Sequence, residues 1–220
     1  MTRAGRFSFL FFLILLAAGC AGPESPTPLL FSDDFEENLD RWEFTDPDAW
    51  RLEMLNGNPV LSLFQNSRYE PPVRSPLNIA LIRDQEFENF LLEVRMESTS
   101  REYDHRDLCL FFGWQGPTRF YYAHLATVAD PHANSIFLVD DEPRVSIAEE
   151  RTDGTRWKDG RFHTVRVRRN VENGLILVYF DDDSEPIMRA TDRTLGKGRI
   201  GVGSFDDPGR FDRVRIWAEP

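Results

Sequence analysis

Residues 107–134 (DLCLFFGWQGPTRFYYAHLATVADPHAN) contain side chains that could take part in acid–base chemistry. Asp107 offers a carboxylate, and His124 offers an imidazole that exchanges protons near neutral pH. Two apolar runs flank the turn-forming residues 115–118, which predicts a β-hairpin. Tyr122 and His124 then share one face, because side chains alternate along a strand. We interpret His124 and Asp107 as candidate catalytic groups. The alternative is that His124 is a structural residue whose hydrogen bonds are satisfied within or beside the sheet.

Two further predicted strands have a polar face that carries both signs of charge. In residues 90–97 the apolar side chains alternate with Glu93 and Arg95, and in residues 163–169 they alternate with Arg166. One interpretation is the solvent-exposed face of an antiparallel sheet. The other is a binding face, on which these charged side chains join the hairpin in a single groove.

A groove of that composition would suit a sugar. An aromatic ring packs against the C–H face of a sugar ring, and planar charged groups contact its hydroxyls in pairs. Glu93 then becomes a candidate acid or base beside His124 and Asp107, and Asp130 is a further candidate. The candidate substrate-binding residues are Arg95, Trp114, Tyr122, Asp130, His132, Asn134 and Arg166.

The loop that contains Asp130, His132 and Asn134 follows the hairpin directly. These residue types could ligate a metal ion, but their spacing matches no zinc pattern, and an ordinary hydrogen-bonded turn also explains them. We expect the loop to form a rim of the pocket beside Tyr122 and His124.

The N-terminal residues predict export and lipid anchoring. Arg3 and Arg6 precede an apolar run over residues 7–16, and small residues then lead to Cys20. The apolar run is too short to span a bilayer as a mature helix. The pattern resembles a bacterial lipoprotein signal, in which the cysteine is lipidated and becomes the first residue of the mature chain. Simple secretion with an incidental cysteine is the alternative.

This resemblance divides the chain into three parts. Residues 1–19 are the expected signal peptide, residues 20–28 the lipidated Cys20 and a proline-rich tether, and residues 29–220 the folded domain. The implied location is the cell envelope, on an outer membrane if the cell has one. Cys109 then has no partner for an internal disulfide, and we expect it to be a small buried hydrophobe.

Composition limits the function of the domain. The 220 residues include 18 Phe, 14 Gly and 14 Pro, and the formal net charge of −11 would repel a nucleic-acid backbone. A neutral sugar remains compatible with that charge. The many short apolar runs separated by turn residues predict an all-β sandwich of two antiparallel sheets.

Several segments resemble the concanavalin A-like jelly-roll sandwiches, including LamG and laminarinase-like domains and the 3-keto-disaccharide hydrolase-like family of bacterial lipoproteins. The segments are FSDDFEENLDRWEF, FYYAHLA, RWKDGRFHTVRVRR, VYFDDDSEPI and GRIGVGSFDDPGRFDRVRIW. Laminarinase-like enzymes carry two glutamates and an aspartate alternating on one strand, and no such string occurs in this chain. Their retaining mechanism, which needs two carboxylates about 5 Å apart, is therefore not expected.

The resemblance requires no cofactor but allows a structural calcium ion, which carboxylates and carbonyls would hold. Aspartates that could lie where the first and last strands meet are Asp33, Asp34, Asp206, Asp207 and Asp212. The sequence does not select ligands among them.

Three functions remain open: an enzyme that cleaves a glycoside, a carbohydrate-binding module without catalysis, and an envelope protein-interaction domain without a sugar site. The expected partner is an oligo- or polysaccharide, and the domain is expected to be a monomer. The direction of side chains separates the hypotheses. If Glu93, Tyr122, His124 and Arg166 line one groove, the two sugar hypotheses gain support.

Overall fold

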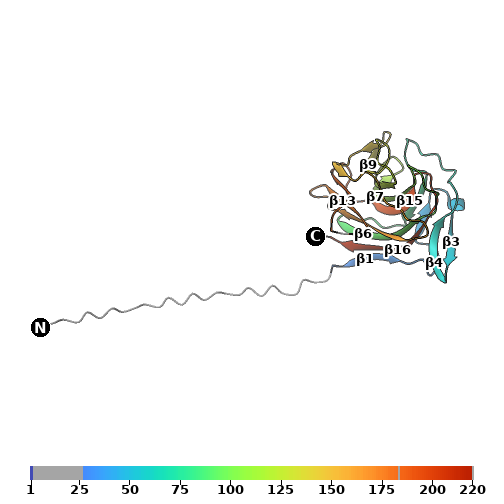
Figure 1. Ribbon diagram of the computed structural model, residues 1–220, viewed down its shortest axis with the longest axis horizontal. Helices are drawn as coiled ribbons and strands as arrows, with labels where there is room; N and C mark the ends of the chain where they lie inside the picture. Colours follow the sequence, from blue (N-terminus) through green and yellow to red (C-terminus); the bar gives the residue numbers. More distant parts are fainter. Residues whose placement is uncertain (2–26, 183, 220) are drawn as a thin grey trace.

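The computed structural model describes residues 1, 27–182 and 184–219, and it consists of two antiparallel β-sheets packed face to face (Figure 1). The nine-stranded sheet has the order β11-β14-β13-β12-β6-β16-β4-β3, with β1 paired to β16, and the seven-stranded sheet has the order β10-β9-β8-β7-β15-β5-β2. The predicted all-β sandwich is confirmed.

The strands are β1 (Leu29–Asp33), β2 (Trp42–Phe44), β3 (Trp50–Leu55), β4 (Asn58–Leu63), β5 (Asn78–Ile82), β6 (Phe90–Ser98), β7 (Asp107–Gly116), β8 (Arg119–Ala126), β9 (Ser135–Asp140), β10 (Val145–Ser146), β11 (Glu150–Arg151), β12 (His163–Arg169), β13 (Leu175–Phe180), β14 (Met188–Thr191), β15 (Arg199–Ser204) and β16 (Gly209–Ala218). A 3-10 turn covers Pro47–Ala49.

The predicted signal peptide, Cys20 and most of the tether lie outside the described residues. Within the described ranges, no helix has the length and apolar character needed to cross a membrane. The two ends of the described domain meet, because β1 pairs with β16 and the amide of Ala218 donates to the carbonyl of Pro28 at 2.8 Å. Residues 27–220 therefore contain both sheets and the core between them.

The main core fills the space between the two sheets. Leu92 and Val94 of β6 face Leu108, Leu110 and Phe112 of β7 across it, and all five side chains are fully buried. Burial of each such side chain stabilises the fold by roughly 1.5–3 kcal/mol. Because side chains alternate, the residues between them point away from this core on each sheet.

A second apolar cluster covers the outward face of the seven-stranded sheet. Cys109 and Phe111 of β7 and Phe120 and Tyr122 of β8 belong to it, and Val73 from the long β4–β5 connection packs against it. All four strand residues are fully buried. The apolar run in β7 is nearly continuous for this reason, because both of its faces are covered. The central hairpin has no solvent-exposed face along most of its length.

Candidate functional site

The structure separates the predicted site residues into two groups on different sheets. Glu93 and Arg166 lie on the outward face of the nine-stranded sheet, where the register pairs them directly and Arg166 Nε donates to Glu93 Oε2 at 2.8 Å. Arg95 lies on the same face and contacts Asp212 Oδ2 at 3.1 Å. The hairpin residues belong to the other sheet. The hypothesis of one groove containing Glu93, Tyr122, His124 and Arg166 is therefore wrong.

Tyr122 and Trp114 are buried rather than open to a ligand. Tyr122 stacks on Phe137 with ring centroids 5.2 Å apart, and its hydroxyl accepts a hydrogen bond from Arg144 Nη1 at 2.9 Å. Burial raises the pKa of the Tyr122 hydroxyl well above its ordinary value. Trp114 stacks on Phe120 at 4.5 Å. In this structure neither ring presents an open face on which a sugar could pack.

The loop after β8 was predicted to form a rim beside Tyr122 and His124, but Asp130, His132 and Asn134 do not line the cavity found in the structure. Asp130 contacts His105 Nε2 at 2.8 Å, and its other carboxylate oxygen accepts the amide of His132. Asn134 is fully buried: its Nδ2 donates to the Thr152 carbonyl, and its Oδ1 accepts from Thr155 Oγ1 at 2.8 Å. Asn134 thus holds the segment around residues 152–155 in place.

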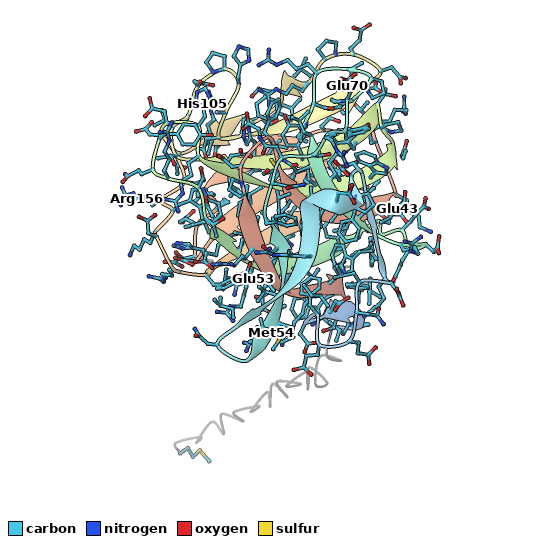
Figure 2. All side chains as sticks on the ribbon, turned by 90° about the vertical axis from the view of Figure 1, so that its right-hand side faces the viewer. Glu43, Glu53, Met54, Glu70, His105 and Arg156 are labelled. Carbon is cyan, nitrogen blue, oxygen red and sulfur yellow. The ribbon has the colours of Figure 1, made fainter. Side chains whose placement is uncertain are left out.

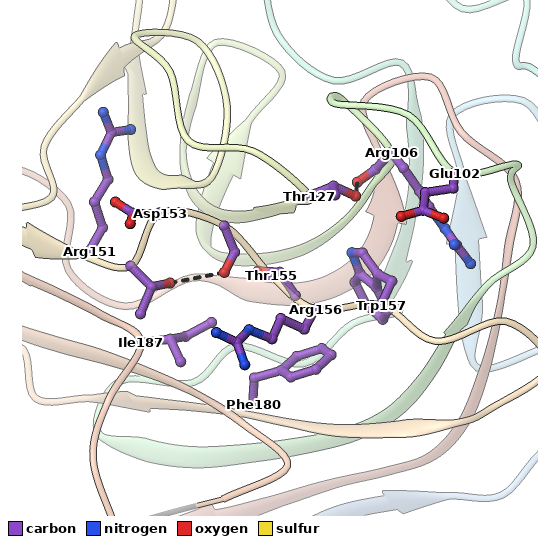
Figure 3. A pocket seen from close by; sticks show the side chains of 12 residues that line it. Glu102, Arg106, Thr127, Arg151, Asp153, Thr155, Arg156, Trp157, Phe180 and Ile187 are labelled. Atoms are coloured by element: carbon purple, nitrogen blue, oxygen red, sulfur yellow. Dashed lines mark hydrogen bonds between the residues drawn. The ribbon is translucent and has the colours of Figure 1, made fainter.

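That segment forms one wall of an open cavity of about 840 Å³. The lining residues are Glu102, Arg106, Thr127, Arg151, Thr152, Asp153, Gly154, Thr155, Arg156, Trp157, Phe180 and Ile187. Figure 3 shows Arg151 and Asp153 at one end of the cavity, Glu102 and Arg106 at the other, and Trp157 near Phe180. The cavity falls within the size range of small-ligand sites.

The aromatic part of the cavity is rigidly held. Trp157 Nε1 donates to the Leu125 carbonyl at 2.9 Å, which ties the indole to the end of β8. Its ring meets Phe180 edge to face at 5.1 Å and His163 at 5.5 Å. Trp157 and Phe180 are only partly buried, so each contributes apolar surface both to the core and to the cavity.

The charged lining residues differ in how they are paired. Arg106 is buried and fully engaged, because its guanidinium donates to both Ser98 oxygens and to Asp159. Glu102, Asp153 and Arg156 are exposed (Figure 2 shows Arg156 at the surface), and none of the three side chains makes a hydrogen bond or ion pair with another described residue. These three groups can contact a ligand without first breaking an internal bond.

Sequence reasoning did not identify this cavity. None of the lining residues was among the candidate site residues, and Arg151, Asp153 and Arg156 lie in or shortly after the two-residue strand β11. The wall is assembled from five separate segments of the chain, so no local pattern marks it. The only local signal was the turn-rich sequence between the predicted strands, which is typical of loops that carry function.

The aspartates considered for calcium do not gather in one place. Asp33 accepts hydrogen bonds from the Trp42 indole and the Phe35 amide. Asp206 and Asp207 instead lie beside Asp107, where one carboxylate oxygen from each falls within 4.8 Å of the others. Three aspartate side chains are few for calcium, which takes six to eight oxygen ligands. The five residues as a set do not fit a calcium site.

Asp107 also contacts the remaining candidate catalytic group. Its Oδ2 lies 3.2 Å from His124 Nε2, and both side chains are almost completely buried. Phe205 stacks on the His124 ring, with centroids 6.0 Å apart. The structure therefore brings Asp107 and His124 together as a buried pair, but it places neither in the open cavity. Their predicted catalytic role remains a prediction.

Comparison with known structures places this architecture among known folds. No protein-family model matches the chain, and a comparison with curated protein sequences found no match. The carbohydrate binding module CBM66 from Bacillus subtilis is 15% identical with a TM-score of 0.56, covering 81% of this chain and 96% of that one. The fold is concanavalin A-like.

Two further structures agree with that assignment. A putative glycosyl hydrolase from Parabacteroides distasonis is 14% identical with a TM-score of 0.58, covering 86% of this chain and all of that one. Winged bean acidic lectin, solved with methyl-α-D-galactose, is 13% identical with a TM-score of 0.56, covering 86% of this chain and 97% of the lectin chain. At these identities the likeness establishes the jelly-roll fold.

Proposed function

We propose that this concanavalin A-like domain binds a carbohydrate chain in the cavity next to Trp157. The observation that carries the proposal is the combination of partly exposed aromatic surface with three unpaired charged side chains around one opening. Aromatic rings pack against the C–H faces of sugars, and carboxylates and guanidinium groups bond to hydroxyls in pairs. A site of this kind needs no large net charge on its ligand.

The structural neighbours support the choice of ligand class. One is a carbohydrate binding module, and two were solved with bound sugars, methyl-α-D-galactose in the winged bean lectin and Man3GlcNAc in the VIP36 lumenal domain. We further propose that Cys20 carries a lipid and that residues 20–28 tether a monomeric domain to the cell envelope. The domain would then hold a glycan close to the membrane surface.

We propose binding rather than hydrolysis as the primary activity. Glu93 is paired with Arg166 on the opposite sheet, and Asp107 and His124 are buried outside the cavity. Most glycosidases use two carboxyl groups that flank the scissile bond. The candidates named from the sequence do not supply such a pair at the cavity. Cleavage is tested in the same experiment as binding.

The test is a glycan-array screen of residues 27–220, followed by calorimetry with the best ligand and an assay for new reducing ends. Arg156→Ala and Asp153→Asn should each weaken binding about tenfold or more, since a hydrogen bond to a charged group contributes about 1.5–3 kcal/mol. Both residues are exposed, so neither variant should unfold the domain. Arg193→Ala, an exposed arginine outside the cavity, is the matched control.

Three outcomes would change the proposal. Unaltered binding by both folded variants would move the site away from the cavity. New reducing ends would make the domain an enzyme. If the folded wild-type domain binds no glycan on the array, a protein-interaction role would be favoured.

A further inference from the structure

A second group of chemically active side chains lies where β7 and β8 meet the β15–β16 connection. Asp107 and Cys109 come from β7, and His124 comes from the directly opposed position on β8, where the register pairs it with Cys109. One donor atom from each of the three lies within 4.8 Å of the other two. Asp206, on the adjoining connection, brings a further carboxylate to Asp107.

We propose that His124, Cys109 and Asp107, completed from the exposed side by Asp206, form a binding site for a zinc-like divalent metal ion. The proposal is independent of carbohydrate binding, because none of these four residues lines the cavity beside Trp157.

Unsatisfied polar atoms point to a missing ligand at this place. His124 is 4% exposed, and its Nδ1 makes no hydrogen bond with a described residue, while its Nε2 lies 3.2 Å from Asp107 Oδ2 without the geometry of a hydrogen bond. Asp107 is fully buried, and its Oδ1 also has no hydrogen-bond partner within the described part of the chain. Leaving such a group unsatisfied costs about 1–3 kcal/mol. A bound cation would remove that cost.

The negative charge of the neighbouring carboxylates also favours a bound cation. Asp107, Asp206 and Asp207 lie close together, and no arginine or lysine forms an ion pair with any of them among the described residues. Tyr103, Ser100 and the Asp107 amide donate hydrogen bonds to Asp207, but none of these donors carries a positive charge. A dication would offset this concentration of negative charge.

The donor atoms favour zinc over calcium. Zinc takes four ligands drawn from imidazole nitrogen, thiolate sulfur and carboxylate oxygen, whereas calcium takes six or more oxygens. Donors around tetrahedral zinc stand about 3.3–3.8 Å apart, from metal–ligand lengths of about 2.0–2.3 Å. Here His124 Nε2 and Cys109 Sγ lie 3.2 and 3.3 Å from Asp107 Oδ2. Small side-chain rotations would bring the three donors around one ion.

Cys109 has a defined chemical step in this proposal. The Cys109 thiol is fully buried and donates to Asp107 Oδ2 at 3.3 Å, so the metal-free protein keeps the S–H bond. Metal binding breaks the S–H bond, forms the sulfur–metal bond and releases one proton to solvent. No oxidant or reductant is needed.

The test uses residues 27–220 after dialysis against a chelator. Equilibrium dialysis with zinc should leave one ion per chain, and titration with cobalt should produce a near-ultraviolet sulfur-to-cobalt charge-transfer band. Cys109→Ser should abolish the band, and His124→Gln should weaken zinc affinity by at least about tenfold, because even outer-shell changes have effects of that size. Circular dichroism of the metal-free variants checks that they fold.

The matched control is His132→Gln, which alters an exposed histidine near the acidic Asp130 and so reports adventitious surface binding. Its zinc affinity should equal that of the wild type. Failure of the folded wild-type domain to retain zinc would overturn the proposal. So would cobalt binding without the sulfur band, or an equal loss of affinity in the control. If Cys109→Ser does not fold, the wild-type cobalt spectrum alone decides whether sulfur is a ligand.

Discussion

Replacing Asp206 with asparagine should stabilise the metal-free domain. Asp206 has an exposed side chain, and one of its carboxylate oxygens lies within 4.8 Å of oxygens of both Asp107 and Asp207. Two like charges at that separation repel by about 1 kcal/mol in water, and salt reduces this further. Because the side chain is exposed, we expect a total gain of about 0.5–1 kcal/mol.

The gain should depend on pH in a defined direction. The pKa of Asp206 is raised in the folded domain above its ordinary value of 3.8, first by partial desolvation of the carboxyl group and then by the charges of Asp107 and Asp207. The repulsion is therefore present when the pH exceeds the folded-state pKa, and it disappears as the pH falls through that value and the carboxyl takes up a proton. The advantage of the variant should vanish in acid.

Thermal unfolding in the presence of a chelator measures this effect. For a domain of about 190 residues, 0.5–1 kcal/mol corresponds to roughly 1–4 °C in Tm at neutral pH. Asp34→Asn, an exposed aspartate outside the cluster, is the matched control and should change Tm very little. Lower stability of Asp206→Asn at neutral pH would refute the electrostatic reasoning. With zinc added, the same variant should instead lose part of the ligand-induced stabilisation.

Two further substitutions test the separation of roles across the sandwich. Arg169→Met should lower the free energy of unfolding, measured in urea, by at least about 3 kcal/mol. Arg169 is buried, and its guanidinium donates to the carbonyls of Gly174, Asp192 and Leu195. A smaller loss would mean that water replaces the guanidinium as the donor to these carbonyls. Glu93→Gln should lower the free energy of unfolding by about 1 kcal/mol or less and leave glycan affinity unchanged. Weaker glycan binding by this variant in calorimetry would show that the glycan site includes the nine-stranded sheet.

Much of the fold follows from period-two patterns in the sequence. Residues 90–97 and 163–169 were assigned correct faces, and the register then pairs Glu93 with Arg166 across neighbouring strands. Alternation tells which residues share a face but not which sheet a strand joins. The polar face of one sheet could therefore be mistaken for the lining of a groove that includes the other sheet.

The burial of Tyr122 could not be predicted from the hairpin alone. Its face is apolar next to Phe111 and Phe120, and the residue that packs against this cluster, Val73, is distant in the sequence. The cavity beside Trp157 was missed for a similar reason, because it combines loop segments that show no periodicity. His124 and Asp107 were selected by residue type, and the structure does place them in contact.

The start of β7 relates the proposed cavity to the proposed metal site. Arg106 immediately precedes β7 and lines the cavity, whereas Asp107, the first residue of β7, contacts His124. Both residues are fixed by several bonds: Arg106 donates to Ser98 and Asp159, and Asp107 accepts the Phe205 amide and donates its own amide to Asp207. A ligand in either site would therefore meet a backbone that is held from both sides. Because the two sites share backbone but no ligand-contacting side chain, variants at Arg156 and Cys109 can test them separately.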